Sequence, residues 1–159
     1  MPDHERVHTS ISRSGPVTVV AVTTVGPVGV DVQEESATRF DGFASVALHH
    51  TERDGTPAHR ATTWARKESL LKATGHGLTL PPAEVALSGA EEPPRLVHWP
   101  EEAGELEPVV IHDLELLPGY AAAMTVLSDS PIAVRVRQED PAAPSPPTMP
   151  GRAPGATPR

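Results

Sequence analysis

Polar residues in two short segments of the chain have the types needed to bind a divalent metal ion and a phosphate group. Asp31 and Gln33 lie in VGVDVQ, and Glu68 and Lys72 lie in WARKESLLK. Mg²⁺ prefers hard oxygen ligands and in proteins usually completes its coordination with water and substrate phosphates. A lysine beside such an ion adds positive charge toward the same phosphates. These residues therefore form a candidate site for magnesium and phosphate.

The same residues also have an ordinary structural interpretation. Asp31 is then a strand-end or turn aspartate. Glu68 and Lys72 form an exposed pair one helical turn apart, which contributes only about 0.2–0.5 kcal/mol to helix stability. Spacing alone does not choose between the two interpretations.

A strand is expected to position Asp31 and Gln33. Residues 15–33 are rich in valine and threonine and are interrupted by Gly26 and Pro27, which predicts two strands joined in a hairpin by a tight turn. Side chains alternate between the faces of a strand, so Asp31 and Gln33 share the face opposite the valines of the second strand. The two side chains are therefore expected to be neighbours.

A helix is expected to position Glu68. Thr56 and the proline after it have the pattern of an N-cap and a first helical residue, and helical spacing continues up to Gly75, which predicts a helix over residues 57–74. Glu68 falls within the apolar stripe of this helix, one turn after Trp64. A carboxylate on the inward face needs a partner, because burying an unpaired charge is costly.

Short strands are expected to follow the helix, at residues 84–88, 108–116, 119–127 and 131–137, with a turn at 117–119. One main helix combined with several strands places the fold in the α+β class. The rest of the chain, 141–159, is proline-rich and nearly free of bulky apolar residues, so we expect a disordered tail after a single domain over 1–140.

The composition limits the class of partner and the compartment. The formal net charge of -8 argues against nucleic acid as the main partner, although a basic group between Arg53 and Lys72 leaves room for a local anionic ligand. Without cysteine the chain forms no disulfide or thiolate metal site, which favours a reducing cytoplasm. No stretch approaches the roughly 20 apolar residues needed to cross a bilayer, so a membrane is not an expected partner.

The residue order in both segments resembles the paired signatures of the 4′-phosphopantetheinyl transferase superfamily. These signatures are a glycine-hydrophobic-aspartate strand and a Trp-x-x-Lys-Glu-Ser/Ala-x-x-Lys helix. The matching positions are Gly29, Val30 and Asp31, followed by Trp64, Lys67, Glu68, Ser69 and Lys72.

The resemblance extends to either side of these motifs and covers about residues 8–127. Residues 10–15 are similar to the Ser-x-Ser-His-Ser-Gly segment of the larger, surfactin-activating type. Residues 119–123 resemble the closing strand of that type. The resemblance implies short antiparallel strands packed against the helix that carries the motif.

The activity implied is the Mg²⁺-dependent transfer of the phosphopantetheine arm of coenzyme A onto a serine of an apo carrier protein. Such carrier proteins serve fatty-acid, polyketide or nonribosomal-peptide synthesis. The resemblance assigns Mg²⁺ and the coenzyme A pyrophosphate to Asp31, Glu68 and the position of Gln33. Glu68 also accepts, directly or through water, the proton of the attacking serine.

The resemblance also implies contacts between basic residues and the phosphates of coenzyme A. Lys72 and Lys67 would steady the transferred phosphate, and Ser12 and Arg13 would lie near the 3′-phosphate. The chemistry is an in-line phosphoryl displacement, in which positioning and charge neutralisation carry most of the catalysis. The leaving group would be adenosine 3′,5′-bisphosphate.

The chain departs from the family pattern at several points. Gln33 stands where the family usually has glutamate and offers a metal only one weaker oxygen. Arg13 replaces a histidine that contacts coenzyme A, and only a short polar segment precedes Ser10, where the larger type has a leading half-domain. Three explanations stay open: a truncated or trimmed enzyme, a homo-oligomer that completes its site between subunits, or a non-catalytic member that binds coenzyme A or a carrier protein.

Other polar residues are expected to have structural roles. The eight histidines show no metal-ligand spacing and are expected at the surface or at helix ends. Glu52 precedes the predicted helix and is expected to favour helix entry electrostatically. Trp64 is expected to pack and so fix the helix that carries Glu68.

Overall fold

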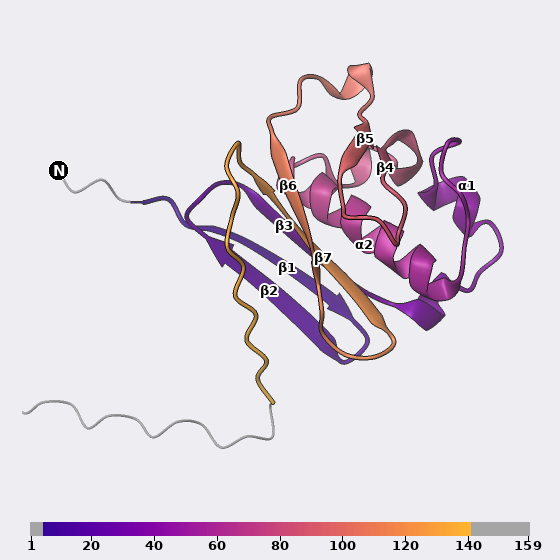
Figure 1. Cartoon of the computed structure of the whole chain (residues 1–159), viewed down its shortest axis with the longest axis horizontal. Coiled ribbons are helices and arrows are strands. Elements are labelled where there is room, and N and C mark those ends of the chain that lie inside the picture. The colour runs from indigo at the N-terminus through magenta and orange to yellow at the C-terminus, as the bar shows by residue number, and fades with distance from the viewer. Residues whose placement is uncertain (1–4, 141–159) are drawn as a thin grey trace, which may run out of the picture.

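The centre of the fold is one long helix against an antiparallel sheet. The computed structural model describes residues 5–140 (Figure 1). Helix α2 (Pro57–Ala73) lies against a sheet of strand order β3-β7-β6, whose strands are β3 (Val28–Glu34), β7 (Tyr120–Leu127) and β6 (Val109–Leu114). This arrangement confirms the expected α+β class with antiparallel strands packed against the motif helix.

Helix α2 begins and ends as its sequence predicts. The Thr56 hydroxyl accepts a hydrogen bond from the His59 amide at 3.2 Å, and Pro57 occupies the first turn. Beyond the last helical residue, Gly75 takes a φ of 76°, which a glycine adopts without steric cost. The prediction of a helix at 57–74 is confirmed to within one residue.

Close packing between α2 and β3 depends on Gly29. A Cβ atom at this position would lie 2.0 Å from the backbone oxygen of Ser69 and 2.5 Å from the backbone nitrogen of Ala73. No other residue fits this contact without moving the helix. The glycine of the strand motif thus brings the backbone of β3 against the helix that carries Glu68 and Lys72.

A hairpin of β1 (His8–Ser14) and β2 (Val17–Thr23) flanks β3. β1 and β3 belong to different sheets and are joined through side chains. The hydroxyls of Ser10, Ser12 and Ser14 accept hydrogen bonds from backbone amides of β3 at 3.0, 3.2 and 3.0 Å. Three serines at alternate positions therefore hold the hairpin against the edge of β3.

The hairpin predicted over residues 15–33 is wrong. Both strands form, but β2 pairs with β1, and β3 pairs with β7. The tight turn lies at Gly15, whose φ of 56° suits the first central position of a two-residue hairpin loop. Gly26 instead packs against β7, since a Cβ there would lie 2.3 Å from the Leu127 oxygen.

A smaller group of elements lies on the other side of α2 from the hairpin (Figure 1). It contains α1 (Phe43–Ala47), β4 (Ala86–Leu87) and β5 (Leu96–His98), together with short 3₁₀ turns at Glu35–Thr38, Gly77–Thr79, Pro82–Glu84 and Glu101–Ala103. The sequence predicted the position of β4, but it did not indicate α1 or β5, which are too short for a clear periodic pattern.

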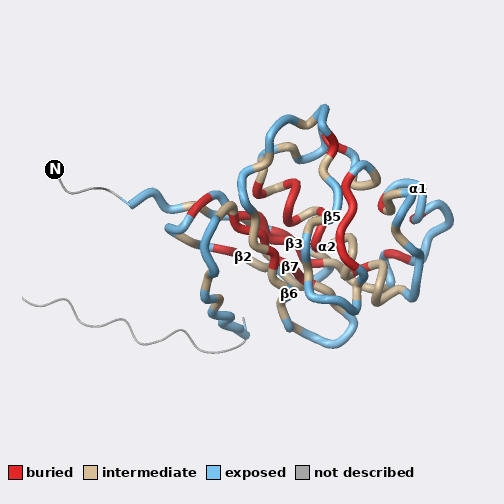
Figure 2. The backbone as a smooth tube through the Cα atoms, turned by 45° about the horizontal axis from the view of Figure 1, so that its top comes forward, coloured by how far each residue is buried: buried red, intermediate tan, exposed pale blue. Residues whose placement is uncertain are grey.

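Two apolar clusters fill the interior, and Figure 2 shows the buried stretches where α2 meets the strands. One lies between α2 and the smaller group and contains Leu70, Leu71, Leu80, Val85, Leu87 and Ile111. The other lies between the hairpin and the sheet and contains Ala21, Val28, Val30 and Val126. Helix α2 contributes Leu70 and Leu71 to the first cluster, and the second cluster joins the hairpin to the sheet.

The C-terminal predictions have different outcomes. β6 and β7 lie within the ranges predicted for them, with the turn at 117–119 between them. The strand predicted at 131–137 is wrong, because that alternating segment finds no hydrogen-bonded partner strand. The tail predicted at 141–159 lies outside the described residues. No helix of the described part of the chain is both long and apolar enough to cross a membrane.

Candidate active site

Asp31 lies in the middle of β3. One of its carboxylate oxygens has hydrogen-bond partners and the other has none among the described residues. Oδ1 accepts hydrogen bonds from the Ser12 hydroxyl and from the Lys72 ammonium group, both at 2.8 Å. Oδ2 is buried and has no hydrogen-bond partner among the described residues. A buried carboxylate oxygen without a partner is energetically costly, so this atom is suited to receive a cation.

Glu68 is the second carboxylate of the site and lies half-buried on α2. Burial raises the pKa of Glu68, the negative charge of Asp31 raises it further, and Lys72 opposes the rise. Burial also raises the pKa of Asp31, against the opposing effects of Lys72 and Ser12. The two carboxylates therefore repel each other in a partly buried position, and a divalent cation between them would relieve this repulsion.

Lys72 joins the C-terminal turn of α2 to β3. Its ammonium group donates to the Val30 carbonyl oxygen at 3.0 Å and to Asp31 Oδ1 at 2.8 Å. An ammonium group has three hydrogens, so one is left over from these two bonds, and the side chain is 31 % exposed. Lys72 is thus placed to contact a phosphate beside Asp31. The structure brings Asp31, Glu68 and Lys72 together, as the sequence predicts.

Gln33 occupies the same face of β3 by strand alternation, two residues beyond Asp31. It is half-buried, and its side-chain nitrogen donates to the Glu34 carbonyl oxygen at 3.2 Å. This bond uses the amide nitrogen and leaves the amide oxygen as the atom that a metal would take.

Ser12 and Arg13 do not point to a common site. They are successive residues of β1, and successive side chains of a strand face opposite ways. Ser12 is buried against β3, whereas Arg13 is exposed and its Nε donates to the Gly15 carbonyl oxygen at 3.0 Å. The structure places the two side chains on opposite faces of β1, and their contact with a 3′-phosphate stays a prediction.

Lys67 is a buried structural residue. Its side chain is 0 % exposed, and its ammonium group donates to the Ala47 and Pro82 carbonyl oxygens and to the Glu52 carboxylate. Burial lowers the pKa of Lys67, against the opposing effect of Glu52. Because all three ammonium hydrogens are engaged, the structure does not support the phosphate contact expected for Lys67.

Glu52 is the residue whose role the sequence analysis missed. Beside its ion pair with Lys67, its carboxylate accepts hydrogen bonds from the backbone amides of His49 and Leu87, both at 2.8 Å. Glu52 thus connects the segment before α2 to the helix and to β4. The signal available in the sequence was a glutamate shortly before a helix that carries an inward lysine.

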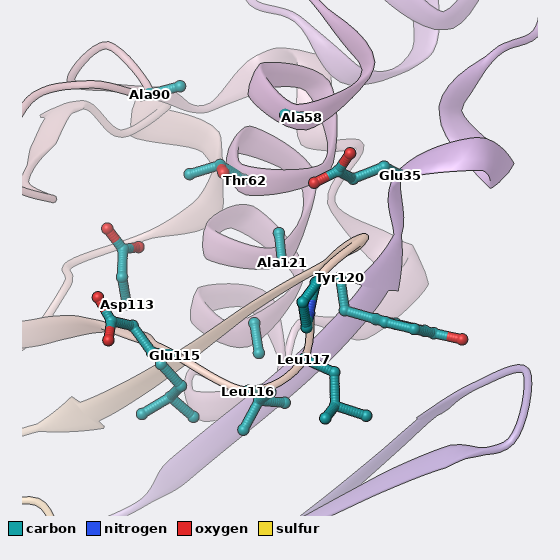
Figure 3. Close-up of a pocket in the computed structure, with 13 residues that line it drawn as sticks. Glu35, Ala58, Thr62, Ala90, Asp113, Glu115, Leu116, Leu117, Tyr120 and Ala121 are labelled. Carbon is teal, nitrogen blue, oxygen red and sulfur yellow. The ribbon is translucent and has the colours of Figure 1, made fainter.

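The two described cavities lie away from Asp31. One, of about 390 Å³, lies beside the N-terminal half of α2 and the β6–β7 turn, and its lining includes Glu35, Thr62 and Tyr120 (Figure 3). Another, of about 510 Å³, lies between the loops near 51–55 and 87–92. Neither cavity is lined by Asp31, Glu68 or Lys72. The candidate site is therefore identified by its two carboxylates and its ammonium group, and not by a cavity.

The donor set fits magnesium. No group of three or more His, Asp or Glu residues within 5–140 is arranged to hold a metal ion, so the protein offers two carboxylates and the Gln33 amide. Mg²⁺ is typically held in this way, by one or two carboxylates with water and substrate phosphates completing the octahedron. Asp31 Oδ2, which has no hydrogen-bond partner among the described residues, would be the ligand atom for such an ion.

Comparisons with known proteins identify the family to which the chain belongs. Residues 27–125 match the family model of the 4′-phosphopantetheinyl transferase superfamily. No curated protein matches the chain. A solved holo-(acyl-carrier-protein) synthase from Bacillus anthracis str. Ames, in complex with CoA (3′,5′-ADP), has a similar fold with 23% sequence identity and a TM-score of 0.50, over 67% of this chain and 97% of that one. The chain therefore belongs to the 4′-phosphopantetheinyl transferase superfamily, a family of transferases.

Proposed function

We propose that this protein transfers the 4′-phosphopantetheine arm of coenzyme A to a serine of an apo carrier protein, with Mg²⁺ held by Asp31 and Glu68. The observation that carries the proposal is the buried Asp31 Oδ2 without a partner, beside a second carboxylate and Lys72. The family match and the coenzyme A bound by the similar synthase support the choice of substrate.

The metal would be held by Asp31 through Oδ2, by the Glu68 carboxylate and more weakly by the Gln33 amide oxygen. When bound, Mg²⁺ would neutralise charge on the pyrophosphate of coenzyme A. Lys72 adds a positive charge through the ammonium hydrogen that Val30 and Asp31 leave over. Arg13 is exposed and remains our proposed contact for a phosphate at the edge of the site.

Proton transfer is assigned to Glu68. The serine hydroxyl of the carrier protein attacks the phosphorus next to pantetheine, so that an O–P bond forms and the bond to adenosine 3′,5′-bisphosphate breaks. Glu68 accepts the hydroxyl proton, directly or through water.

A transfer assay tests the proposal. The purified chain is incubated with coenzyme A carrying a fluorescent arm and a panel of apo carrier proteins, with Mg²⁺ or with EDTA. We expect labelling that requires Mg²⁺ and falls at least about 100-fold in Asp31→Asn and Glu68→Gln, because each change removes a charged ligand. Glu115→Gln is the matched control, since Glu115 is exposed and lies outside the site.

Two results would contradict the proposal. One is transfer that continues in EDTA, and the other is transfer that survives in Asp31→Asn. Absence of any labelling, with coenzyme A still bound, would favour the second candidate, a non-catalytic family member. Gln33 in the place of the usual glutamate is the feature that favours this alternative. A cytoplasmic location, which the lack of cysteine favours, belongs to the same proposal.

A further inference from the structure

The Ser12 hydroxyl donates its single hydrogen to Asp31. The residue is 8 % exposed, its Oγ donates to Asp31 Oδ1 at 2.8 Å, and the same oxygen accepts from the Val32 amide at 3.2 Å. A serine hydroxyl has one hydrogen to donate. In this arrangement none is left for a phosphate.

The neighbouring serines of β1 lack this second bond. Ser10 and Ser14 accept hydrogen bonds from β3 amides, as Ser12 does, with N···O distances of 3.0 Å each. Among the described hydrogen bonds, Ser12 is the member of the row that also donates to a carboxylate. The chain thus contains two internal controls that share the strand contact of Ser12 and lack its contact with Asp31.

The bonds to Asp31 determine which of its oxygens is free. Ser12 and Lys72 both donate to Oδ1, from β1 and from α2, while Oδ2 has no partner among the described residues. Two donors on one oxygen oppose rotation of the carboxylate about its Cβ–Cγ bond. Donors to a ligating carboxylate are known to orient it and to raise metal affinity.

We propose that Ser12 is a positioning residue for Asp31, which it holds with Oδ2 directed toward a divalent cation, and that it is not a ligand of the 3′-phosphate. This inference rests on the proposed function, in which Asp31 binds Mg²⁺. It adds β1, which lies before the stretch matched by the family model, to the elements that build the metal site.

The first experiment measures Mg²⁺ binding by calorimetry, with the chain saturated in coenzyme A and the heat of Mg²⁺ binding to coenzyme A alone subtracted. Ser12→Ala is expected to weaken Mg²⁺ binding about 10- to 100-fold, and Ser10→Ala and Ser14→Ala by less than about twofold. Ser12→Thr keeps the hydroxyl and is expected to restore binding. Ser12→Cys, which donates only weakly, is a second variant of nearly unchanged size and should also weaken binding.

The second experiment tests whether Ser12 positions Asp31 or binds the 3′-phosphate, by comparing two ligands. Binding of coenzyme A and of dephospho-coenzyme A, which lacks the 3′-phosphate, is measured without metal for the wild-type chain and for Ser12→Ala. We expect the ratio of the two affinities to be the same in both proteins. A loss of affinity confined to coenzyme A would place Ser12 at the 3′-phosphate and overturn the inference.

Thermal unfolding of the same variants separates positioning from strand stability. Alanine at each of the three positions removes the bond from a β3 amide, and Ser12→Ala also removes the bond to Asp31, so Ser12→Ala is expected to lose at least as much stability as Ser10→Ala and Ser14→Ala. Equal Mg²⁺ affinity in Ser12→Ala and Ser10→Ala would overturn the inference and leave the proposed function intact. A wild-type chain that binds coenzyme A but no Mg²⁺ would overturn both.

Discussion

At the scale of single residues, the site joins two carboxylates whose pKa values are both raised. Burial is the main cause for Asp31 and for Glu68, and repulsion between them contributes at Glu68. Without a metal ion, the folded protein therefore holds negative charge in a position that disfavours it. The same arrangement that favours a cation reduces the stability of the metal-free chain.

Glu68→Gln is expected to stabilise the metal-free chain at neutral pH. A group whose pKa is higher in the folded state than in the unfolded state contributes stability that is present below the unfolded pKa and lost as pH rises through the folded pKa. Glutamine permanently imitates the protonated form. The variant should therefore unfold at a higher temperature than the wild type at pH 7 in EDTA.

The difference should disappear in acid. Below the ordinary glutamate pKa of 4.5, the wild-type side chain is protonated in both states and resembles glutamine. Calorimetric scans at pH 7 and pH 4 measure both effects, and Glu115→Gln is again the control. An unfolding temperature that fell at pH 7 would show that Glu68 stabilises the metal-free fold.

Sequence reasoning succeeded where the relevant contacts are local. Strand alternation predicted that Asp31 and Gln33 share one face of the strand, and helical spacing predicted that Glu68 lies on the inward face of the helix. It was wrong for Lys67, because burial of that side chain depends on Glu52 and on carbonyl groups of distant segments. Arg66 is buried in the same way: it is 1 % exposed and bonded to Asp113.

At the scale of elements, the buried Glu52 and Lys67 pair connects α2 to its surroundings. Lys67→Met is expected to lower the free energy of unfolding by about 3–5 kcal/mol, because it leaves a buried carboxylate without its cation. Urea unfolding measures the change. Arg95→Gln is the control, since the Arg95–Glu92 pair is exposed and should contribute less than about 1 kcal/mol.

An equal effect of the two changes would contradict a structural role for Lys67. So would a Lys67→Met variant of normal stability that had lost affinity for coenzyme A. That second result would indicate that Lys67 contacts a phosphate of coenzyme A.

Strand pairing was the part of the fold that the sequence predicted least well. Gly15-Pro16 and Gly26-Pro27 are both plausible turns, and the choice between them depends on which strand finds a partner. β3 pairs with β7, about 90 residues later in the chain, a contact that no short window contains. The closing strand was recognisable at 119–127, as were its neighbours β3 and β6, but its pairing with β3 was not.

At the scale of the whole molecule, the part that matches the family model does not include the β1–β2 hairpin. The fold around α2 is that of the superfamily, and the hairpin, which precedes the matched residues, lies along the edge of β3. The resemblance to the larger type in residues 10–15 stays a prediction, as does the domain boundary at residue 140.

Removal of residues 141–159 tests that boundary. The segment has few bulky apolar residues, so it cannot contribute a core of its own. We expect a chain of residues 1–140 to keep its unfolding temperature within about 2 °C and its transfer activity within about twofold. A larger loss in either measurement would show that the segment contributes to the domain.

The three serines of β1 also determine how far the hairpin lies from β3. Between β3 and β7 the spacing is fixed by the backbone and is the same for any sequence. Between β1 and β3 it is fixed by the length of three side chains. The side-chain length of Ser10, Ser12 and Ser14 therefore sets the distance between β1 and β3. A shorter residue loses the hydrogen bond to β3. A longer residue moves the hairpin away from β3, and with the hairpin it moves the Ser12 hydroxyl away from Asp31.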